Sequence, residues 1–284
     1  MFTKDTLRGE TIIITGGGSG LGLSMAKAFG AVGASVAICG RDAARLKKGA
    51  DEIAASGISV RTAVCDVRDH EAVQRMFQEL TKDGAEITGL VNNAAGNFLC
   101  AAEDLSPNAF KSVVDIVLHG SFNCTQAFGK HRIERKKPGT VLSIVTTYTE
   151  CGSSFVLPSA CAKAGVHAMT TSLAYEWADY GIRLNSIAPG PFPTEGAWQR
   201  LVPDPRLEET FRKRVPLGRF GKPEELGDLA VFLMSNHSSF ITGECVTIDG
   251  GERLNAGQFN FILQAMPKAK LKATFNAMRQ KEPK

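Results

Sequence analysis

The sequence predicts an α/β fold in which a doubly wound parallel sheet of about seven strands is covered by helices on both faces. Short β-branched runs alternate with helical patterns along the chain, and this alternation implies right-handed crossovers between parallel strands. The first run ends in a glycine-rich turn that leads directly into a helix. No internal repeat, low-complexity segment or linker divides the 284 residues, a length that α/β proteins reach as one domain.

Seven short runs rich in β-branched and apolar residues are the expected strands, because each is bounded by turn-forming or polar residues. They comprise residues 11–14, 34–39, 58–64, 87–91, 140–145, 182–187 and 244–248. Apolar residues at helical spacing predict helices between them. These helices comprise residues 20–31, a segment around Val73, Met76, Phe77 and Leu80, residues 106–135, a helix from Pro158 that includes Val166, Met169, Leu173 and Trp177, and residues 223–234.

One domain is expected over residues 1–257, followed by a C-terminal tail over residues 258–284. Lysines alternate with apolar residues in this tail, a pattern that leaves helix and irregular structure both open. A proline-rich stretch at residues 190–214 is longer than an ordinary connection. It therefore predicts a lid or a substrate-binding loop.

Composition excludes several classes of protein. The formal net charge is +4 and no long Lys/Arg block occurs, so nucleic acid is not expected as the main partner. The basic cluster at residues 131–137 is interpreted as the solvated end of a helix, with a phosphate-binding patch as the alternative. Seven scattered cysteines lack metal-ligand spacing, so the sequence predicts reduced thiols and no metal site.

Targeting and membrane segments are not expected. Residues 1–10 lack the apolar core of a signal peptide, and no apolar stretch is long enough to span a bilayer. The chain ends in Glu282-Pro283-Lys284, which differs from the peroxisomal Ser-Lys-Leu signal. These features predict a cytoplasmic protein.

The glycine-rich turn is the clearest binding motif. Small residues there let the backbone approach a pyrophosphate, and the helix N-terminus offers N–H groups and a favourable dipole. The motif consists of Thr15, Gly16, Gly17, Gly18, Ser19, Gly20, Leu21 and Gly22. Its spacing resembles the Thr-Gly-x-x-x-Gly-x-Gly motif of the short-chain dehydrogenase/reductase family, which implies a single-domain Rossmann fold and a nicotinamide dinucleotide cofactor.

The tip of the second expected strand discriminates between NAD and NADP. An acidic residue at this place accepts hydrogen bonds from the ribose hydroxyls of NAD, whereas an arginine meets the 2′-phosphate of NADP. Arg41 is the first charged residue after the strand, so NADP(H) is the predicted cofactor. Asp42 is expected to cap the helix that begins at residue 43.

The family resemblance extends to the ends of three later strands. It implies that Asp66 lies at the adenine edge of the cofactor, with capping of the following helix as the alternative. It also implies that Asn93 belongs to a turn beside the cofactor, in a motif that has one more Ala than the family's. The segment that holds the nicotinamide carboxamide in the family is matched by Pro189, Gly190, Pro191 and Phe192.

The reacting centre departs from the usual family layout, in which a Tyr precedes the catalytic Lys by one helical turn on the same face. Here Ser159 has that position ahead of Lys163, and the nearest phenol is Tyr148, just after the fifth expected strand. Together with Asn97, these residues resemble the 2,4-dienoyl-CoA reductase branch, over nearly the whole chain. The resemblance implies that all four are catalytic and that Lys163 also binds the nicotinamide ribose.

Reduction of a conjugated C=C bond explains this layout. Hydride reaches the distant end of the dienoyl system while negative charge accumulates on the thioester oxygen, so the donors must lie further along the substrate. Tyr148 and Asn97 would hold that oxygen, and Ser159 would link the hydrogen-bond network. In the alternative interpretation, Tyr148 packs under the following loop and Asn97 caps a turn.

A CoA thioester also carries phosphates, for which the bidentate guanidinium group is a suitable partner. The resemblance implies substrate contacts by Arg68, Arg200 and Ser106, with Phe98 along the acyl path. It implies further contacts to the acyl head by Tyr148 and Ser159. Taken without the resemblance, both arginines would be ordinary surface charges.

The expected function is NADPH-dependent reduction of 2,4-dienoyl-CoA to 3-enoyl-CoA in the β-oxidation of unsaturated fatty acids. A trans-2-enoyl-CoA reductase is the nearest alternative, and a non-catalytic NADPH-binding relative is the alternative from another class. A carbonyl reductase is disfavoured because Ser159 replaces the usual phenol. Relatives commonly assemble as homotetramers, so the same state is expected here, through the helices at residues 106–135 and 158–177.

Overall fold

The computed structural model describes residues 2–194 and 204–279 of the chain. Its seven strands form one parallel sheet in the order β3-β2-β1-β4-β5-β6-β7. The strands are β1 (Thr11–Thr15), β2 (Ser35–Gly40), β3 (Val60–Val64), β4 (Gly89–Asn92), β5 (Gly139–Ile144), β6 (Ile182–Pro189) and β7 (Cys245–Ile248). The predicted single-domain Rossmann fold is confirmed, and the strand ends differ from the expected ones by no more than two residues.

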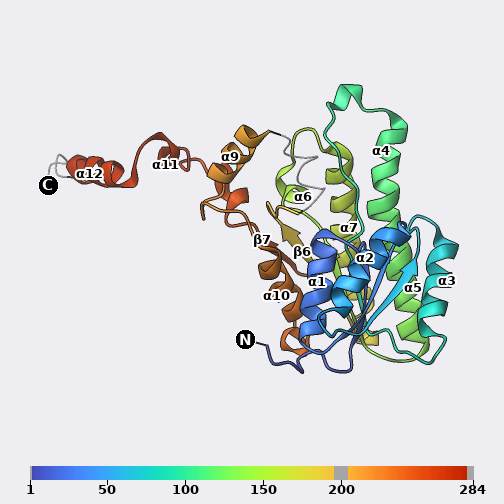
Figure 1. The fold of residues 1–284 in the computed structure, drawn as a ribbon. Coiled ribbons are helices and arrows are strands. Elements are labelled where there is room, and N and C mark those ends of the chain that lie inside the picture. The colour runs from blue at the N-terminus through green and yellow to red at the C-terminus, as the bar shows by residue number, and fades with distance from the viewer. Residues whose placement is uncertain (1, 195–203, 280–284) are drawn as a thin grey trace.

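Helices cover both faces of the sheet (Figure 1). On one face lie α1 (Gly20–Ala31), α2 (Ala43–Ala54) and α10 (Pro223–Met234), and on the other lie α3 (His70–Thr81), α5 (Gly120–Glu134) and α7 (Leu157–Glu176). Successive residues of β1 serve the two layers in turn: Ile12 and Ile14 belong to the first core cluster and Ile13 to the second. All three are fully buried, as a parallel sheet covered on both faces requires.

The order of the strands fixes where a ligand can bind. β1 pairs with β2 on one side and with β4 on the other, so the chain reverses its direction of winding at this point. The crossovers from β1 and from β4 then leave a crevice at the carboxyl ends of the two strands. In open α/β sheets this crevice is the general ligand site.

The expected helix over residues 106–135 consists of three parts. α4 (Pro107–Val114) leads through a π-helical turn at Asp115–His119 into α5. Gly120 follows this turn, and a Cβ atom there would lie 2.5 Å from Cγ2 of Val67. The wider π turn accompanies a close passage of the helix over the loop after β3, a detail that apolar spacing does not encode.

The long connection before α10 is partly helical. Asp204 caps α9 (Pro205–Arg214), so the expected loop at residues 190–214 contains a helix at its end. Tyr148 opens a one-turn helix, α6 (Tyr148–Cys151), where the sequence predicted a loop. The remaining short elements are η1 (Ala102–Asp104), η3 (Ala178–Tyr180), η4 (Asn236–Ser238), η5 (Glu252–Ala256), α11 (Ile262–Ala265) and α12 (Lys268–Arg279).

The end of α5 corrects one expectation. The cluster at residues 131–137 was expected to be solvated, but His131 and Arg132 are buried. Arg132 donates from Nε to the carbonyl oxygen of Pro138 at 2.8 Å and from Nη1 to that of Ile87 at 3.1 Å. Its Nη1 also pairs with Glu86 at 2.6 Å, which lowers the pKa of that carboxyl group. Arg132 thus joins α5 to the starts of β4 and β5.

Arg132→Ala is expected to lower the free energy of unfolding by about 2–4 kcal/mol, because two buried carbonyl groups lose their donor. Urea denaturation followed by circular dichroism measures the change. Arg135→Ala is the matched control: this neighbour is exposed and donates to the carbonyl oxygen of His131, in its own helix, at 3.3 Å. Equal losses for the two variants would contradict the structural role of Arg132.

Candidate active site

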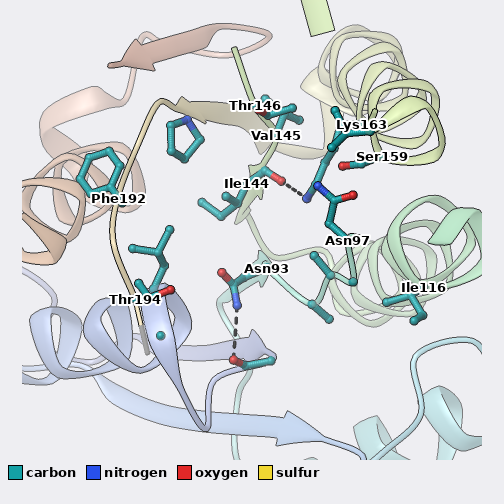
Figure 2. Close-up of a pocket in the computed structure, with 18 of the residues that line it drawn as sticks. Asn93, Asn97, Ile116, Ile144, Val145, Thr146, Ser159, Lys163, Phe192 and Thr194 are labelled. Carbon is teal, nitrogen blue, oxygen red and sulfur yellow. Dashed lines mark hydrogen bonds between the residues drawn. The ribbon is translucent and has the colours of Figure 1, made fainter. Parts of the chain in front are cut away.

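The carboxyl ends of β1, β2, β4, β5 and β6 open into a cavity of about 1870 Å³, part of which Figure 2 shows. In this view Asn97, Ser159 and Lys163 lie on one side of the cavity, and Phe192 and Thr194 lie on the other. Most predicted cofactor residues line it: Gly16, Gly18, Ser19, Gly20, Leu21, Arg41, Asp66, Asn93, Lys163, Pro189, Gly190, Pro191 and Phe192. The cavity is thus one continuous space between the glycine-rich turn and the reacting centre.

The glycine-rich turn fits a dinucleotide because it has no room for side chains. A Cβ atom at Gly17 would lie 2.5 Å from Cγ2 of Ile38, and one at Gly22 would lie 2.5 Å from the carbonyl oxygen of Gly16. Gly16 and Gly20 have φ values of +67° and +55°, which favour glycine. The glycines therefore leave backbone groups accessible at the N-terminus of α1, as binding of a pyrophosphate requires.

Asn93 ties this turn to β4. Its Nδ2 donates to the carbonyl oxygen of Thr15 at 2.9 Å and to that of Gly16 at 3.3 Å, and Figure 2 shows the second of these contacts. Its backbone N–H donates to Oγ1 of Thr15 at 2.9 Å. Asn93 also lines the cavity, so one residue can hold the turn and face a ligand.

Three acidic residues in the loops after β2 and β3 have different structural roles. Asp42 accepts from the backbone N–H of Arg45 at 3.0 Å, which confirms it as the cap of α2 and lowers its pKa. Asp69 caps α3, so the alternative that gave this task to Asp66 is wrong. The carboxylate of Asp66 instead binds the guanidinium group of Arg68, Nη2 to Oδ2 at 2.6 Å, and this contact lowers the pKa of Asp66.

The four predicted catalytic residues lie together. The hydroxyl groups of Tyr148 and Ser159 are 2.9 Å apart, and Nδ2 of Asn97 lies 3.5 Å from the hydroxyl oxygen of Tyr148. Asn97 also accepts from the backbone N–H of Phe98 at 2.9 Å, which fixes its amide. Tyr148 lines the cavity from α6, while Ser159 and Lys163 face it from α7. A phenol therefore reaches the site from a different element than Lys163 does.

Lys163 is buried, and its Nζ donates to the carbonyl oxygen of Ile144 at the end of β5 (Figure 2). Burial disfavours the ammonium form and lowers the pKa of Lys163 from 10.5 to about 8. A negatively charged ligand in the cavity would favour the ammonium form again. The group is thus suited to supporting an oxyanion or a ribose hydroxyl.

The residues predicted to contact substrate are more dispersed. Arg68 is exposed and bound to Asp66, and Ser106 caps α4 by accepting from the N–H of Ala109 at 3.2 Å. Phe98 packs against the core cluster under α4 and α7, and its neighbour Leu99 lines the cavity instead. Arg200 lies outside the described residues.

Some cavity residues escaped the sequence analysis. Arg214, at the end of α9, and Arg253, in η5, line the cavity and pair with Glu252 at 3.4 Å and Glu150 at 3.7 Å, respectively. The second pair joins α6, which carries Tyr148, to the segment after β7. For Arg253 the sequence did offer a signal, because this residue lies in the loop after the last expected strand. β7 pairs in parallel with β6, so its carboxyl end lies at the same edge of the sheet as the cavity. Within residues 2–194 and 204–279, no group of three or more His, Cys, Asp or Glu could hold a metal ion.

Comparison with known proteins agrees with this geometry. The profile of a family described as Enoyl-(Acyl carrier protein) reductase matches residues 16–252. The chain belongs to the short-chain dehydrogenase/reductase family. It is 43% identical over 251 residues to a Bacillus subtilis protein named "Probable 2,4-dienoyl-CoA reductase [(2E)-enoyl-CoA-producing]", which covers 88% of this chain and 99% of the relative.

Two further relatives differ in product or substrate. A Caenorhabditis elegans protein named "Probable 2,4-dienoyl-CoA reductase 3 [(3E)-enoyl-CoA-producing]" is 43% identical over 255 residues, 87% of this chain and 81% of the relative. The crystal structure of a gluconate 5-dehydrogenase from Burkholderia cenocepacia with NADP and tartrate has a TM-score of 0.82 at 32% identity, and the match covers 88% of this chain and 98% of that one. The protein with the present sequence is thus an oxidoreductase of the short-chain dehydrogenase/reductase family.

The buried ammonium group predicts a pH-dependent stability. Because the folded-state pKa of about 8 is below the unfolded value of 10.5, charge on Lys163 destabilises the fold below about pH 8, and the penalty is relieved as pH rises from about 8 to 10.5. Lys163→Met is therefore expected to exceed the wild type in unfolding free energy by roughly 2–3 kcal/mol at neutral pH, and by much less at alkaline pH. Urea denaturation across this range measures the difference, and a pH-independent difference would refute the shifted titration.

Proposed function

We propose that the enzyme reduces 2,4-dienoyl-CoA thioesters to 3-enoyl-CoA with NADPH, in the β-oxidation of unsaturated fatty acids. The observation that carries the proposal is the position of Tyr148, whose hydroxyl group lies 2.9 Å from Ser159 and within 3.5 Å of Asn97. Relatives named 2,4-dienoyl-CoA reductase, at 43% identity, support the same substrate class. Neighbours of known structure with bound NADP support the cofactor.

The cofactor would lie between the glycine-rich turn and β6, with its adenine end beside Arg41 and Asp66 and its nicotinamide end beside Phe192 and Lys163. When bound, it supplies a hydride to the δ-carbon of the conjugated acyl group. Negative charge then develops on the thioester oxygen, which Tyr148 and Asn97 stabilise by hydrogen bonds. Ser159 keeps the phenol oriented, and the α-carbon takes a proton from water, which leaves the double bond at the β,γ position.

Substrate recognition at the CoA end is assigned to Arg68, Ser106 and Arg200. Arg68 would exchange part of its contact with Asp66 for a phosphate, to which a guanidinium group binds in the same bidentate manner. Because Asp66 borders the cavity beside the adenine end proposed for the cofactor, this exchange would connect the CoA end of the substrate with the adenine end of the cofactor. Leu99 and Ile116 supply apolar surface for the acyl chain near Asn97.

The proposal extends to assembly and location. A homotetramer through α4, α5 and α7 is supported by exposed aromatic side chains, Phe122 on α5 and Tyr175 on α7. A cytoplasmic location is part of the proposal. In the described part of the chain, no helix has the length and apolar character of a bilayer-crossing segment. Light scattering on the purified protein tests the assembly.

A rival function has a specific observation in its favour. The gluconate dehydrogenase among the neighbours acts on a different substrate class, and Tyr148 lies close enough to Ser159 to serve a carbonyl group at the same place. A screen of NADPH oxidation with dienoyl-CoA, trans-2-enoyl-CoA, ketoacyl-CoA and keto-sugar acids separates these functions. NMR of the dienoyl-CoA product distinguishes the 3-enoyl from the 2-enoyl outcome, and turnover of none of them favours a non-catalytic relative.

Arg41→Ala should weaken NADPH binding about 10- to 150-fold, because loss of a charge-assisted phosphate contact costs roughly 1.5–3 kcal/mol. NADH lacks the 2′-phosphate and should bind nearly as before. Fluorescence titration of the reduced nucleotides gives both dissociation constants. Lys47→Ala is the matched control, since Lys47 is exposed on α2 and pairs with Asp51. Equal weakening of both nucleotides would contradict the assignment.

Tyr148→Phe should lower kcat for dienoyl-CoA by about 10²–10³, because one preorganised donor to the thioester oxygen is lost. NADPH affinity should hardly change. Asn97→Ala should act in the same direction, and the two losses should be non-additive because both donors address one oxygen. Tyr180→Phe, on an exposed phenol of η3, should have no effect.

Ser159→Tyr added to Tyr148→Phe should not restore dienoyl-CoA turnover, since a phenol on α7 would face the wrong end of the conjugated system. Stopped-flow and steady-state assays of the single and double variants provide the comparison. If Tyr148→Phe keeps near-full turnover while Ser159→Ala abolishes it, the reacting oxygen lies against α7 and the proposed layout fails.

A further inference from the structure

The segment after η5 leaves the body of the molecule. Residues 258–284 are called the C-terminal arm here, and its described part, residues 258–279, contains α11 and α12. Figure 1 shows both helices extending to one side, away from the sheet and its helical layers. Residues of this arm do not take part in the three core clusters of the described chain. The arm is therefore an appendage with its own surface.

Large apolar side chains on the arm meet solvent. Three of them precede or occupy α11 and two lie on α12. The exposed fractions are 66% for Phe259, 63% for Phe261, 62% for Leu263, 45% for Phe275 and 61% for Met278. Full burial of such a side chain contributes about 1.5–3 kcal/mol, so several neighbouring ones imply a surface that is covered in use.

The charge of the arm differs from that of the rest of the chain. It holds six Lys or Arg residues and one Glu, so its net charge is +5, whereas the other 257 residues sum to −1 within a total of +4. On α12, Phe275 and Met278 share one face with Leu271, at spacings of four and three residues; Leu271 itself is buried, so Phe275 and Met278 are the exposed part of that face. Lys268 and Lys272 flank that face and are exposed. Cationic groups thus border an apolar stripe.

We propose that the C-terminal arm binds an anionic lipid surface, with α12 lying in the plane of the interface. Amphipathic helices that lie on membranes combine Phe or Leu on one face with Lys-rich polar flanks. Lysine side chains can extend their charges toward lipid headgroups while the stems cover apolar surface. Interfaces between proteins are instead depleted in Lys, and the body of a second copy offers a net charge of only −1. The composition of the arm favours the lipid surface on both counts.

This surface is independent of the reaction proposed for the cavity. Along the chain, the last residue that lines the cavity is Ala256, so none of the described residues of the arm lines it. A peripheral contact of this kind also requires no bilayer-spanning helix. The arm would keep the enzyme beside a membrane through a reversible, salt-sensitive contact.

Vesicle sedimentation with the full-length protein tests the proposal. The wild type should sediment with vesicles of phosphatidylcholine and phosphatidylglycerol, should stay in solution with phosphatidylcholine alone, and should be released by high salt. Phe259→Ser, Phe261→Ser and Phe275→Ser combined should weaken binding at least about tenfold. Phe240→Ser is the matched control, because Phe240 is fully exposed on the body.

Charge is tested separately. Lys268→Gln, Lys270→Gln and Lys272→Gln combined should reduce binding to anionic vesicles, whereas Lys4→Gln, Lys47→Gln and Lys137→Gln combined, exposed lysines of the body, should not. NADPH binding by fluorescence, unchanged in all variants, shows that they are folded. Equal sedimentation with neutral and anionic vesicles would overturn the proposal. So would a loss of oligomeric mass in the Phe variant by light scattering, which would identify a second copy as the occupant.

Discussion

The ammonium group of Lys163 lies buried against the carbonyl oxygen of Ile144, and the rest of the site is arranged around this contact. A buried charge is costly unless a polar group faces it, so the end of β5 and the first turns of α7 must keep a fixed relation. Ser159 precedes Lys163 by one turn on the same helix and is therefore placed by the same contact. The hydroxyl group of Ser159 in turn holds the phenol of Tyr148 at 2.9 Å.

A second constraint acts at the other end of the cavity. Thr15 closes β1, and its hydroxyl and carbonyl groups receive three hydrogen bonds from Asn93 and Ala94 after β4. This junction is the point at which the strand order reverses, so it sets the width of the crevice. The bare glycine turn and the buried lysine are thus held by two separate hydrogen-bond junctions on one sheet edge. A ligand that reaches both junctions, as a dinucleotide would, therefore binds to a site of fixed geometry.

The sequence predicted what local rules determine and missed what tertiary contacts determine. β-branched runs located all seven strands, and the position of Asp42 before a helix identified its cap. The π turn at Asp115–His119 accompanies a close passage over Val67, and the buried Arg132 is bonded to carbonyl groups of distant segments. Apolar character alone could not distinguish Phe98, which packs inward, from Leu99, which lines the cavity. Grouping of Asn97, Tyr148, Ser159 and Lys163 came from family resemblance, since these residues belong to three separate segments.

Relocation of the phenol has a structural consequence. A tyrosine on α7 would share the rigidity of a 20-residue helix, whereas Tyr148 stands on the one-turn helix α6. That helix gains support from the hydroxyl group of Ser159 on one side and from the ion pair between Glu150 and Arg253 on the other. Arg253 belongs to η5, the segment from which the C-terminal arm departs. The donor proposed for the thioester oxygen is therefore supported by the helix that carries Lys163 and by the segment that leads into the C-terminal arm. A half-exposed ion pair contributes little stability of its own, so its effect lies in orienting α6 beside the cavity that Tyr148 lines.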